Sequence, residues 1–345
     1  MRRLPAEWEA QSAIQITWPH PETDWAHDLH EVTNCYLEIA RHISDWQRLL
    51  IACHDAELVR GLLEKKGCDL DNIVFCEVKS NDTWVRDYGA LTILENEKPV
   101  LLDFIFNGWG QKYEAELDNL ITQQLDEQGI FGKTPMRTVN FVLEGGAIET
   151  DGQGTLLATE KSMLSSNRNP MYTKKQIEDF LKQQFGFKRI LWLSHGELLG
   201  DDTDAHIDTL ARFADVDTIL YVKCNDEDDE HYEPLKKMEE ELQSFKTLAG
   251  KPYRLIPLPL PSPIYGTAPD GMPYRLPATY ANFLITNNQV LVPIYNVKQD
   301  AEALKIIAQA FPDRKVIGIN CLPLIKQHGS LHCITMQYPK GVTIR

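Results

Sequence analysis

The chain has 345 residues, of which 43% are hydrophobic and 25% charged, and its formal net charge is −15 at pH 7. This composition is typical of a globular protein with one large domain or two ordinary ones. The acidic balance argues against nucleic acid as a partner, because phosphate binding needs a basic surface. The N-terminal segment lacks the apolar stretch of a secretory signal, and no apolar run approaches the roughly 18 residues of a membrane span. We therefore expect neither a nucleic-acid nor a membrane partner.

The cysteines are odd in number, seven in all, and form no CxxC pair. Neither a disulfide framework nor a zinc cluster is therefore indicated. Several lie in apolar strand-like runs, as Cys53 does, and are expected to be small buried side chains. Reduced thiols favour a cytoplasmic location.

Short apolar strands alternate with amphipathic helices along the chain. In the segment 28–43, apolar residues such as Val32, Tyr36 and Ile39 recur at helical spacing, and Thr173 to Gln176 fits a capping box. The predicted strands are 13–18, 48–53, 73–78, 91–94, 100–106, 137–143, 155–159, 209–214, 218–222, 289–295 and 315–319. The predicted helices are 28–43, 56–66, 113–128, 173–185, 230–248 and 300–310.

Two stretches are predicted to be loops: the acidic run 225–230 and the proline-rich segment 257–277. The second is the kind of long irregular connection that often covers a binding site. The chain contains no Gly/Ser linker, so we expect a single domain over residues 1–345. Its recurring strand–helix rhythm suggests repeated modules.

Four short runs are rich in catalytic residue types: 81–87, 143–146, 201–208 and 329–335. Each follows or interrupts a predicted strand, which places it where a rigid scaffold usually presents catalytic groups. If the third run is extended, His206 and Asp208 face the same pocket, and histidine is the natural acid/base near neutral pH. A metal site with His195 as a further ligand is the rival interpretation, and the lack of ligand-spaced partners disfavours it.

The other runs have equally ordinary structural explanations when each is taken alone. Trp84 offers a ring face to a cation, Asp87 can accept two guanidinium N–H groups, and Arg86 is expected to brace neighbouring carboxylates. Glu144 ends a strand before two glycines, where an inward carboxylate needs a cationic partner. Cys333 follows His332, but adjacent side chains usually point apart, so His332 is not assigned as its base.

Taken together, the runs resemble the agmatine deiminase family, which includes bacterial peptidylarginine deiminase-like enzymes of the guanidino-modifying superfamily. The resemblance covers most of the chain. Its motifs are Pro5-Ala6-Glu7-Trp8, Trp84-Val85-Arg86-Asp87, Glu144-Gly145-Gly146, Asn167-Arg168-Asn169-Pro170, Asp202-Thr203-Asp204-Ala205-His206-Ile207-Asp208 and His332-Cys333-Ile334-Thr335.

The resemblance implies both a fold and a set of roles. The fold is α/β, a five-bladed α/β propeller (pentein) with pseudo-five-fold symmetry and a site on the central axis. By motif, Cys333 matches the nucleophile and His206 the general acid/base. Asp87 and Asp208 match the guanidinium-binding carboxylates, and Glu144 the acidic partner of the histidine.

The chain departs from the usual family pattern around this core. Ala205 stands where glycine is usual, and His328-Gly329-Ser330-Leu331 replaces a triple glycine plus asparagine. Tyr88 and Gly89 replace a usual Thr-Gly-Pro, and Glu149 and Thr150 fall where a histidine and a valine are common. These departures bear on the substrate more than on the chemistry.

The predicted function is hydrolytic deimination of a small cationic guanidino compound, most simply agmatine to N-carbamoylputrescine and ammonia, a step of polyamine metabolism and putrescine biosynthesis. The route is a Cys333 thiouronium intermediate that requires no cofactor, with Trp84, Asp87 and Asp208 binding the substrate. The alternatives are a deiminase for arginine, methylarginine or peptidylarginine, an amidinotransferase, and a non-catalytic guanidine-binding protein. A homodimer is compatible with each of them.

Overall fold

The computed structural model describes residues 2–268 and 271–345. Within these ranges, five separate small sheets share one plan. In each, one strand pairs antiparallel with a neighbour, and that neighbour pairs parallel with a further strand. A helix lies between the two parallel strands in the sequence, as parallel pairing requires. The predicted strand–helix–strand rhythm therefore corresponds to repeated units.

The first unit brings the two ends of the chain together. Its sheet has the order β19-β2-β3-β4, and β19, from the C-terminal region, pairs antiparallel with β2 so that Met336 lies opposite Gln15. This pairing brings the segment that carries Cys333, three residues before β19, next to the N-terminal strand β2. The elements are β2 (Gln11–Thr17), α1 (Leu29–Ser44), β3 (Arg48–Cys53), α2 (Ala56–Lys66), β4 (Ile73–Glu77) and β19 (Met336–Pro339).

The other four units repeat the plan with one principal helix each. In the second, the short β1 (Arg2–Arg3) adds to the edge of β5. The second unit contains β5 (Leu91–Glu95), β6 (Lys98–Ile105), α5 (Ile121–Glu127) and β7 (Met136–Val142), and the third contains β8 (Glu149–Thr150), β9 (Thr155–Thr159), α7 (Lys174–Phe185) and β10 (Arg189–Leu193). The fourth contains β11 (Ala211–Phe213), β12 (Thr218–Lys223), α8 (Tyr232–Ser244) and β13 (Arg254–Pro259), and the fifth β16 (Leu284–Ile285), β17 (Gln289–Ile294), α9 (Asp300–Ala310) and β18 (Lys315–Asn320).

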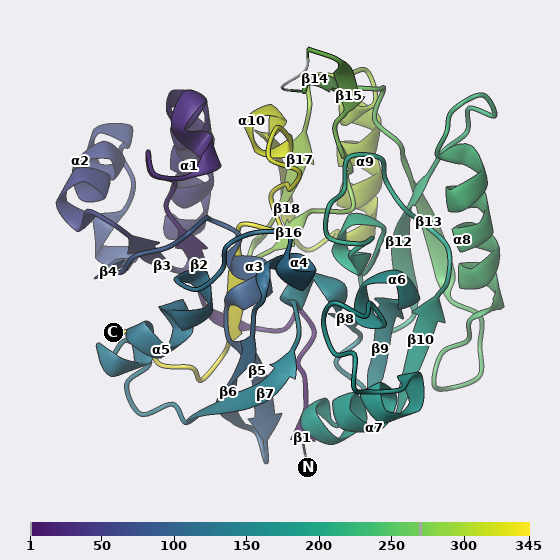
Figure 1. Cartoon of the computed structure of the whole chain (residues 1–345), viewed down its shortest axis with the longest axis horizontal. Helices are drawn as coiled ribbons and strands as arrows, with labels where there is room; N and C mark the ends of the chain where they lie inside the picture. Colours follow the sequence, from purple (N-terminus) through teal and green to yellow (C-terminus); the bar gives the residue numbers. More distant parts are fainter. Residues whose placement is uncertain (1, 269–270) are drawn as a thin grey trace.

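The long helices lie at the periphery, and the strands lie inside them (Figure 1). Helix α1 shows why: Val32, Tyr36, Ile39 and Ile43 recur every three or four residues and are all buried. Each such side chain contributes about 1.5–3 kcal/mol when it leaves water. Helix α7 begins with the capping box that the sequence predicts, and Gly186 ends it in the left-handed conformation.

Short helical turns fill the space between the sheets. Helices α3 (Val85–Tyr88) and α4 (Gly108–Gln111) lie near the centre of the view in Figure 1. Two 3-10 turns, Gly145–Ala147 and Ile207–Thr209, contact each other. The remaining short elements are α6 (Glu160–Met163), α10 (Leu322–Ile325) and the 3-10 turns Asp24–His27, Leu70–Asn72 and Asp118–Leu120.

Three predictions about elements were wrong. The helix predicted over 113–128 begins only at Ile121, after the 3-10 turn Asp118–Leu120, because the backbone N–H groups of Leu117 and Asp118 donate to Oδ1 of Asn81 and not to carbonyls of a helix. The segment 257–277 is not all loop: β14 (Tyr265–Thr267) and β15 (Pro273–Arg275) form a hairpin, although residues 269–270 lie outside the described residues. The run 206–208 enters a 3-10 turn and is not extended.

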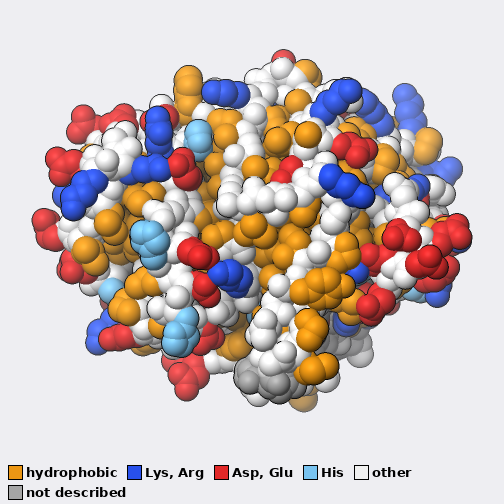
Figure 2. Space-filling view, turned by 90° about the horizontal axis from the view of Figure 1, so that it is seen from above, with side chains coloured by type: hydrophobic (Ala, Val, Ile, Leu, Met, Phe, Trp, Pro, Cys, Tyr) orange, Lys and Arg blue, Asp and Glu red, His pale blue; other side chains and the backbone are white. Residues whose placement is uncertain are grey.

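Figure 2 shows one face of the molecule, with apolar side chains across its middle and acidic ones gathered toward both ends. Among the described helices, none has the length and apolar character needed to cross a membrane.

Candidate active site

The predicted site residues come together although they are spread over about 250 positions of the chain. Asp87 lies in α3, Glu144 precedes the 3-10 turn that follows β7, His206 caps the turn before β11, and Cys333 lies between α10 and β19. All of them are at most 6% exposed. Burying this many ionisable groups is costly unless they contact one another or a ligand.

The Cys333 thiol lies among acceptors. Its Sγ is 3.4 Å from Oδ1 of Asn282 and 4.0 Å from Oδ2 of Asp208. Burial and the negative charges of Asp208 and Asp87 raise the pKa of Cys333 well above its usual value. Without a cation in the pocket, this thiol therefore holds its proton at neutral pH.

His206 lies between two carboxylates. Its Nε2 is 2.8 Å from Oε2 of Glu144, and its Nδ1 is 3.6 Å from Oδ1 of Asp87. Burial disfavours the charged ring, but Asp87 and Glu144 outweigh that penalty and raise the pKa of His206 to about 9. The ring is therefore charged at neutral pH and has a proton to give.

Asp87 is held by neutral donors more than by charges. Its Oδ1 accepts the backbone N–H of Gly146 at 2.9 Å, and its Oδ2 accepts the indole N–H of Trp109 at 2.9 Å. Burial raises the pKa of Asp87 to about 6, with His206 opposing that rise and Glu144 adding to it. This carboxylate would gain from a further cation.

Glu144 and Asp208 each have a close cationic neighbour. Arg168 donates from Nε to both oxygens of Glu144, at 2.8 and 2.9 Å, so that despite burial His206 and Arg168 lower the pKa of Glu144. Oδ2 of Asp208 lies 2.8 Å from Nδ1 of His332, and this contact lowers the pKa of Asp208 against the effect of burial. The other oxygen, Oδ1, is buried and has no hydrogen-bond partner among the described residues.

Two glycines make this close approach possible. A Cβ at Gly146 would lie 2.5 Å from Nδ1 of His206 and 2.9 Å from Oδ1 of Asp87, and a Cβ at Gly329 would lie 2.1 Å from the Trp84 ring. No larger residue fits at either position without moving the site.

A pocket of about 410 Å³ of empty space opens onto Cys333, Asp87 and Trp84. Trp84 is 4% exposed and donates its indole N–H to Oδ2 of Asp82 at 3.0 Å, which fixes the ring as part of the wall. The pocket is lined by Asp24, Asp82, Trp84, Asp87, Trp109, Tyr113, Asp202, Thr203, Gln327, His328, Gly329 and Cys333.

Several residues of the site escaped the sequence analysis or received no role there. Trp109 and Asn282 carry no local motif, and only their contacts with Asp87 and Cys333 reveal them. Arg168 lies in a motif of the family resemblance, which was the signal available. Arg86 does not brace a carboxylate through a hydrogen bond as expected, since Nε and Nη1 donate to the His332 carbonyl and the Met336 sulfur.

The departures from the family pattern coincide with unusual backbone. Ala205, where glycine is usual, has φ of 62°, and His328, within the replaced glycine triplet, has φ of 67°. Both values lie in the left-handed region that favours glycine. Glu149, where histidine is common, is 2.8 Å from Nε of Arg212.

The alternative prediction was a metal site with His195 and His206 as ligands, but these two side chains contact different partners. His195 contacts Glu241 and His206 contacts Glu144, each at 2.8 Å. Within the described ranges, the potential ligands that lie within 4.8 Å of one another are His20, Glu22 and His54. The His20 and His54 rings are stacked at 3.6 Å, so their in-plane nitrogen lone pairs do not converge on one point.

Known proteins resemble this chain over its full length. A Medicago truncatula agmatine deiminase is 31% identical, over 97% of this chain and 96% of its own. A Porphyromonas gingivalis protein provisionally described as an arginine deiminase is 50% identical, with a TM-score of 0.94 over all of both chains. A cysteine-to-serine variant of C. jejuni agmatine deiminase with substrate bound is 39% identical, with a TM-score of 0.91 over 99% of this chain and 97% of its own.

A more distant likeness bears on the fold alone. An amidinotransferase from Microseira wollei is 12% identical, with a TM-score of 0.55 over 99% of this chain and 98% of its own, so the two chains share an α/β fold. The model of the Porphyromonas-type peptidyl-arginine deiminase family matches residues 3–339. The chain belongs to that family.

Proposed function

We propose that this protein hydrolyses the guanidino group of agmatine, giving N-carbamoylputrescine and ammonia. The observation that carries the proposal is the group of reactive side chains at the pocket. Cys333 and Asp87 line it, the charged ring of His206 lies 3.6 Å from Asp87, and Asp208 lies 4.0 Å from the Cys333 sulfur with its Oδ1 left without a donor among the described residues. A guanidinium is planar, stays charged near neutral pH and offers N–H donors in a fixed fork, so it suits such a set of acceptors.

Binding comes first. Asp87 and Asp208 take the N–H groups of the guanidinium and hold its carbon before Cys333. The arriving positive charge offsets the two carboxylates that raise the pKa of the thiol, so the thiolate forms as substrate binds. This order keeps the nucleophile inactive in an empty pocket.

Chemistry then proceeds in two halves. The thiolate attacks the guanidinium carbon, His206 gives its proton to the departing nitrogen, and ammonia leaves a Cys333 thiouronium. His206, now neutral, takes a proton from water, and the resulting hydroxide adds to the same carbon. Collapse expels the thiolate and releases the ureido product. Glu144, 2.8 Å from Nε2, keeps the ring oriented throughout.

The charge of the pocket lining favours an amine-bearing tail. Asp24, Asp82 and Asp202 line the pocket, and its described lining contains no Lys or Arg. The carboxylate of free arginine would meet like charge there, whereas the ammonium of agmatine would be attracted. The second candidate is an arginine or peptidylarginine deiminase, which the family's description and the 50% identical neighbour favour.

We also infer that the five sheets are the blades of a five-bladed α/β propeller, and that residues 1–345 form one guanidine-deiminase domain. The shared plan of the sheets and the distant amidinotransferase likeness support this arrangement. Such a fold gathers catalytic residues from separate units around one axis, which fits the wide spacing of the residues named above.

The test is a ureido-product and ammonia assay across agmatine, arginine, methylarginines and a peptidylarginine substrate, without an acceptor amine. The highest kcat/KM for agmatine with stoichiometric ammonia is expected. A preference for arginine or peptidylarginine would replace agmatine with the second candidate. Turnover that needs an added amine and releases no ammonia would instead identify an amidinotransferase.

A further inference from the structure

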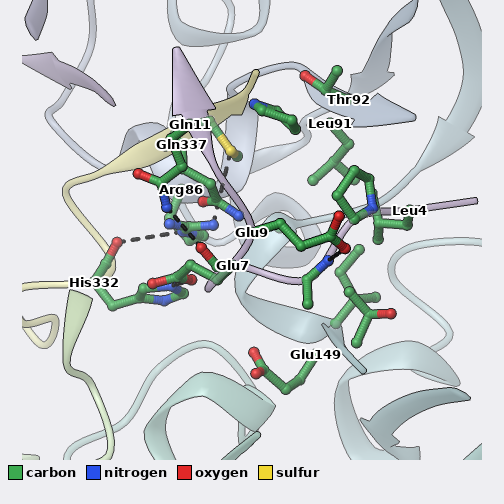
Figure 3. A pocket seen from close by; sticks show the side chains of 17 residues that line it. Leu4, Glu7, Glu9, Gln11, Arg86, Leu91, Thr92, Glu149, His332 and Gln337 are labelled. Carbon is green, nitrogen blue, oxygen red and sulfur yellow. Dashed lines mark hydrogen bonds and ion pairs between the residues drawn. The ribbon is translucent and has the colours of Figure 1, made fainter. Parts of the chain in front are cut away.

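A second buried cluster of charged side chains lies next to the site, and the steps above do not use it. It consists of Glu7, Arg86, Glu149, Arg212 and His332, each at most 6% exposed. Figure 3 shows four of them, Glu7, Arg86, Glu149 and His332, around a cavity separate from the pocket of Cys333. So many buried charges in one place need an explanation beyond packing.

His332 connects this cluster to the site. Its Nδ1 is 2.8 Å from Oδ2 of Asp208, and its Nε2 is 2.7 Å from Oε2 of Glu7. An ionised carboxylate can only accept hydrogen bonds, so both ring nitrogens donate and the ring is an imidazolium. Figure 3 shows the ring facing the Glu7 carboxylate.

Both members of this pair are held in place. The backbone N–H of His332 donates to Oδ1 of Asn282 at 2.8 Å. Oε1 of Glu7 accepts the backbone N–H of Ile285 at 2.7 Å, and its Oε2 accepts Nη2 of Arg212 at 2.8 Å. A continuous chain of contacts therefore runs from Arg212 through Glu7 and His332 to Asp208.

The effect on Asp208 is asymmetric. One of its oxygens is occupied by the His332 ring, while Oδ1 is buried and has no donor among the described residues. Were the ring removed, Oδ2 would keep only the Cys333 thiol, 4.0 Å away, and the carboxylate would lose its closest hydrogen-bond donor. We propose that His332, held by Glu7, is a positioning residue that directs the free oxygen of Asp208 toward the substrate guanidinium and keeps that carboxylate ionised.

This proposal rests on the proposed function, because it assigns Asp208 to guanidinium binding. A purely structural role for His332 predicts something different. It predicts a loss of stability with no change in the pH dependence of catalysis and no change in the orientation of Asp208.

Two substitutions separate the roles of the two ring nitrogens. The amide nitrogen of asparagine lies about where Nδ1 does, so His332→Asn keeps a donor to Asp208 and loses the charge. The amide nitrogen of glutamine lies about where Nε2 does, so His332→Gln keeps a donor to Glu7 and abandons Asp208. The matched control is Tyr338→Phe. Tyr338 lies on β19, the strand after Cys333, and the substitution removes its buried hydrogen bond of 2.6 Å to Gln15 without touching Asp208.

The measurements are kcat and KM against pH, on agmatine or on whichever guanidine the wild type hydrolyses best. We expect kcat/KM of His332→Gln to fall about 100-fold, the effect of a misplaced catalytic group. In His332→Asn the loss should be smaller at pH 8 and about tenfold larger at pH 6, because Asp208 is then more easily protonated. Tyr338→Phe should lower the unfolding temperature with little change in either profile.

Crystal structures of the two variants test the proposal without turnover. Asp208 should keep its orientation in His332→Asn and turn away in His332→Gln. Wild-type kinetics in His332→Gln, or an unmoved Asp208 there, overturns the proposal. Failure of the wild type to act on agmatine overturns only the substrate assignment, since the structures and the other guanidines still decide the role of His332.

Discussion

Two buried carboxylates, Glu7 in the charged cluster and Asp87 in the pocket, differ in how closely cationic side chains surround them. Glu7 lies 2.8 Å from Arg212 and 2.7 Å from His332, and these partners lower its pKa in spite of burial. Asp87 has His206 as its nearest cation, at 3.6 Å, and burial raises its pKa to about 6. Removing the partner of a fully paired buried carboxylate is costly to the fold, whereas a carboxylate left short of positive charge retains the capacity to bind a cationic substrate.

The largest expected effect belongs to the nucleophile. Cys333→Ala should abolish turnover, because the proposed mechanism forms its covalent bond on this thiol, and should leave the fold intact, because a methyl group fits the same buried space. A product assay checks the loss of turnover, and thermal unfolding checks that the fold is intact. Appreciable activity in the purified variant would remove the covalent mechanism.

On the paired side of the comparison, Arg212→Met should cost stability. Arg212 is fully buried between Glu7 and Glu149, so the variant leaves two carboxylates without their cation, at a cost of about 3–5 kcal/mol. Denaturant unfolding measures this cost. Arg137→Met is the control, because the Arg137 pair with Glu95 is largely exposed and should contribute about 0–1 kcal/mol. Equal losses in the two variants would contradict the comparison.

Among the carboxylates proposed to bind the guanidinium, Asp87→Asn and Asp208→Asn should each cost about 2–3 kcal/mol of transition-state stabilisation. A neutral amide leaves the substrate cation partly unpaired, and the loss in kcat/KM should be similar for every guanidine tested, since these groups contact the headgroup and not the tail. Asp87→Asn should change the free energy of unfolding by less than Arg212→Met does. Near wild-type kcat/KM in both variants would make the carboxylates structural.

The smallest effect is a pH dependence in the unmodified protein. Asp87 must be ionised to bind a guanidinium, so kcat/KM should fall as the pH drops below about 6. His206 must be protonated to release ammonia, so kcat/KM should also fall as the pH rises above about 9. A flat profile between pH 5 and 7 would show that Asp87 does not titrate where its burial places it.

Most regular elements were predictable from the sequence because their signals are local. The spacing of apolar residues in α1 and the capping box of α7 depend on side chains within a few positions of one another. The helix predicted over 113–128 was too long because its first residues contact distant groups instead. Tyr113, for example, donates its hydroxyl to Asp202 at 2.8 Å, and no propensity within the segment records that contact.

The motifs likewise identified Asp87, Glu144, His206, Asp208 and Cys333 as residues of interest, since each lies in a run of unusual composition. Only the tertiary structure shows which charged groups lie next to each of them. His332 meets both Asp208 and Glu7, which lie 124 and 325 positions away, and Trp109 donates to Asp87 across 22 positions. Burial and ion pairing set the protonation state of each group, and both depend on which remote segments fold against it. The sequence motifs therefore identify the candidate reactive groups, while the packing of the units determines the protonation state of each.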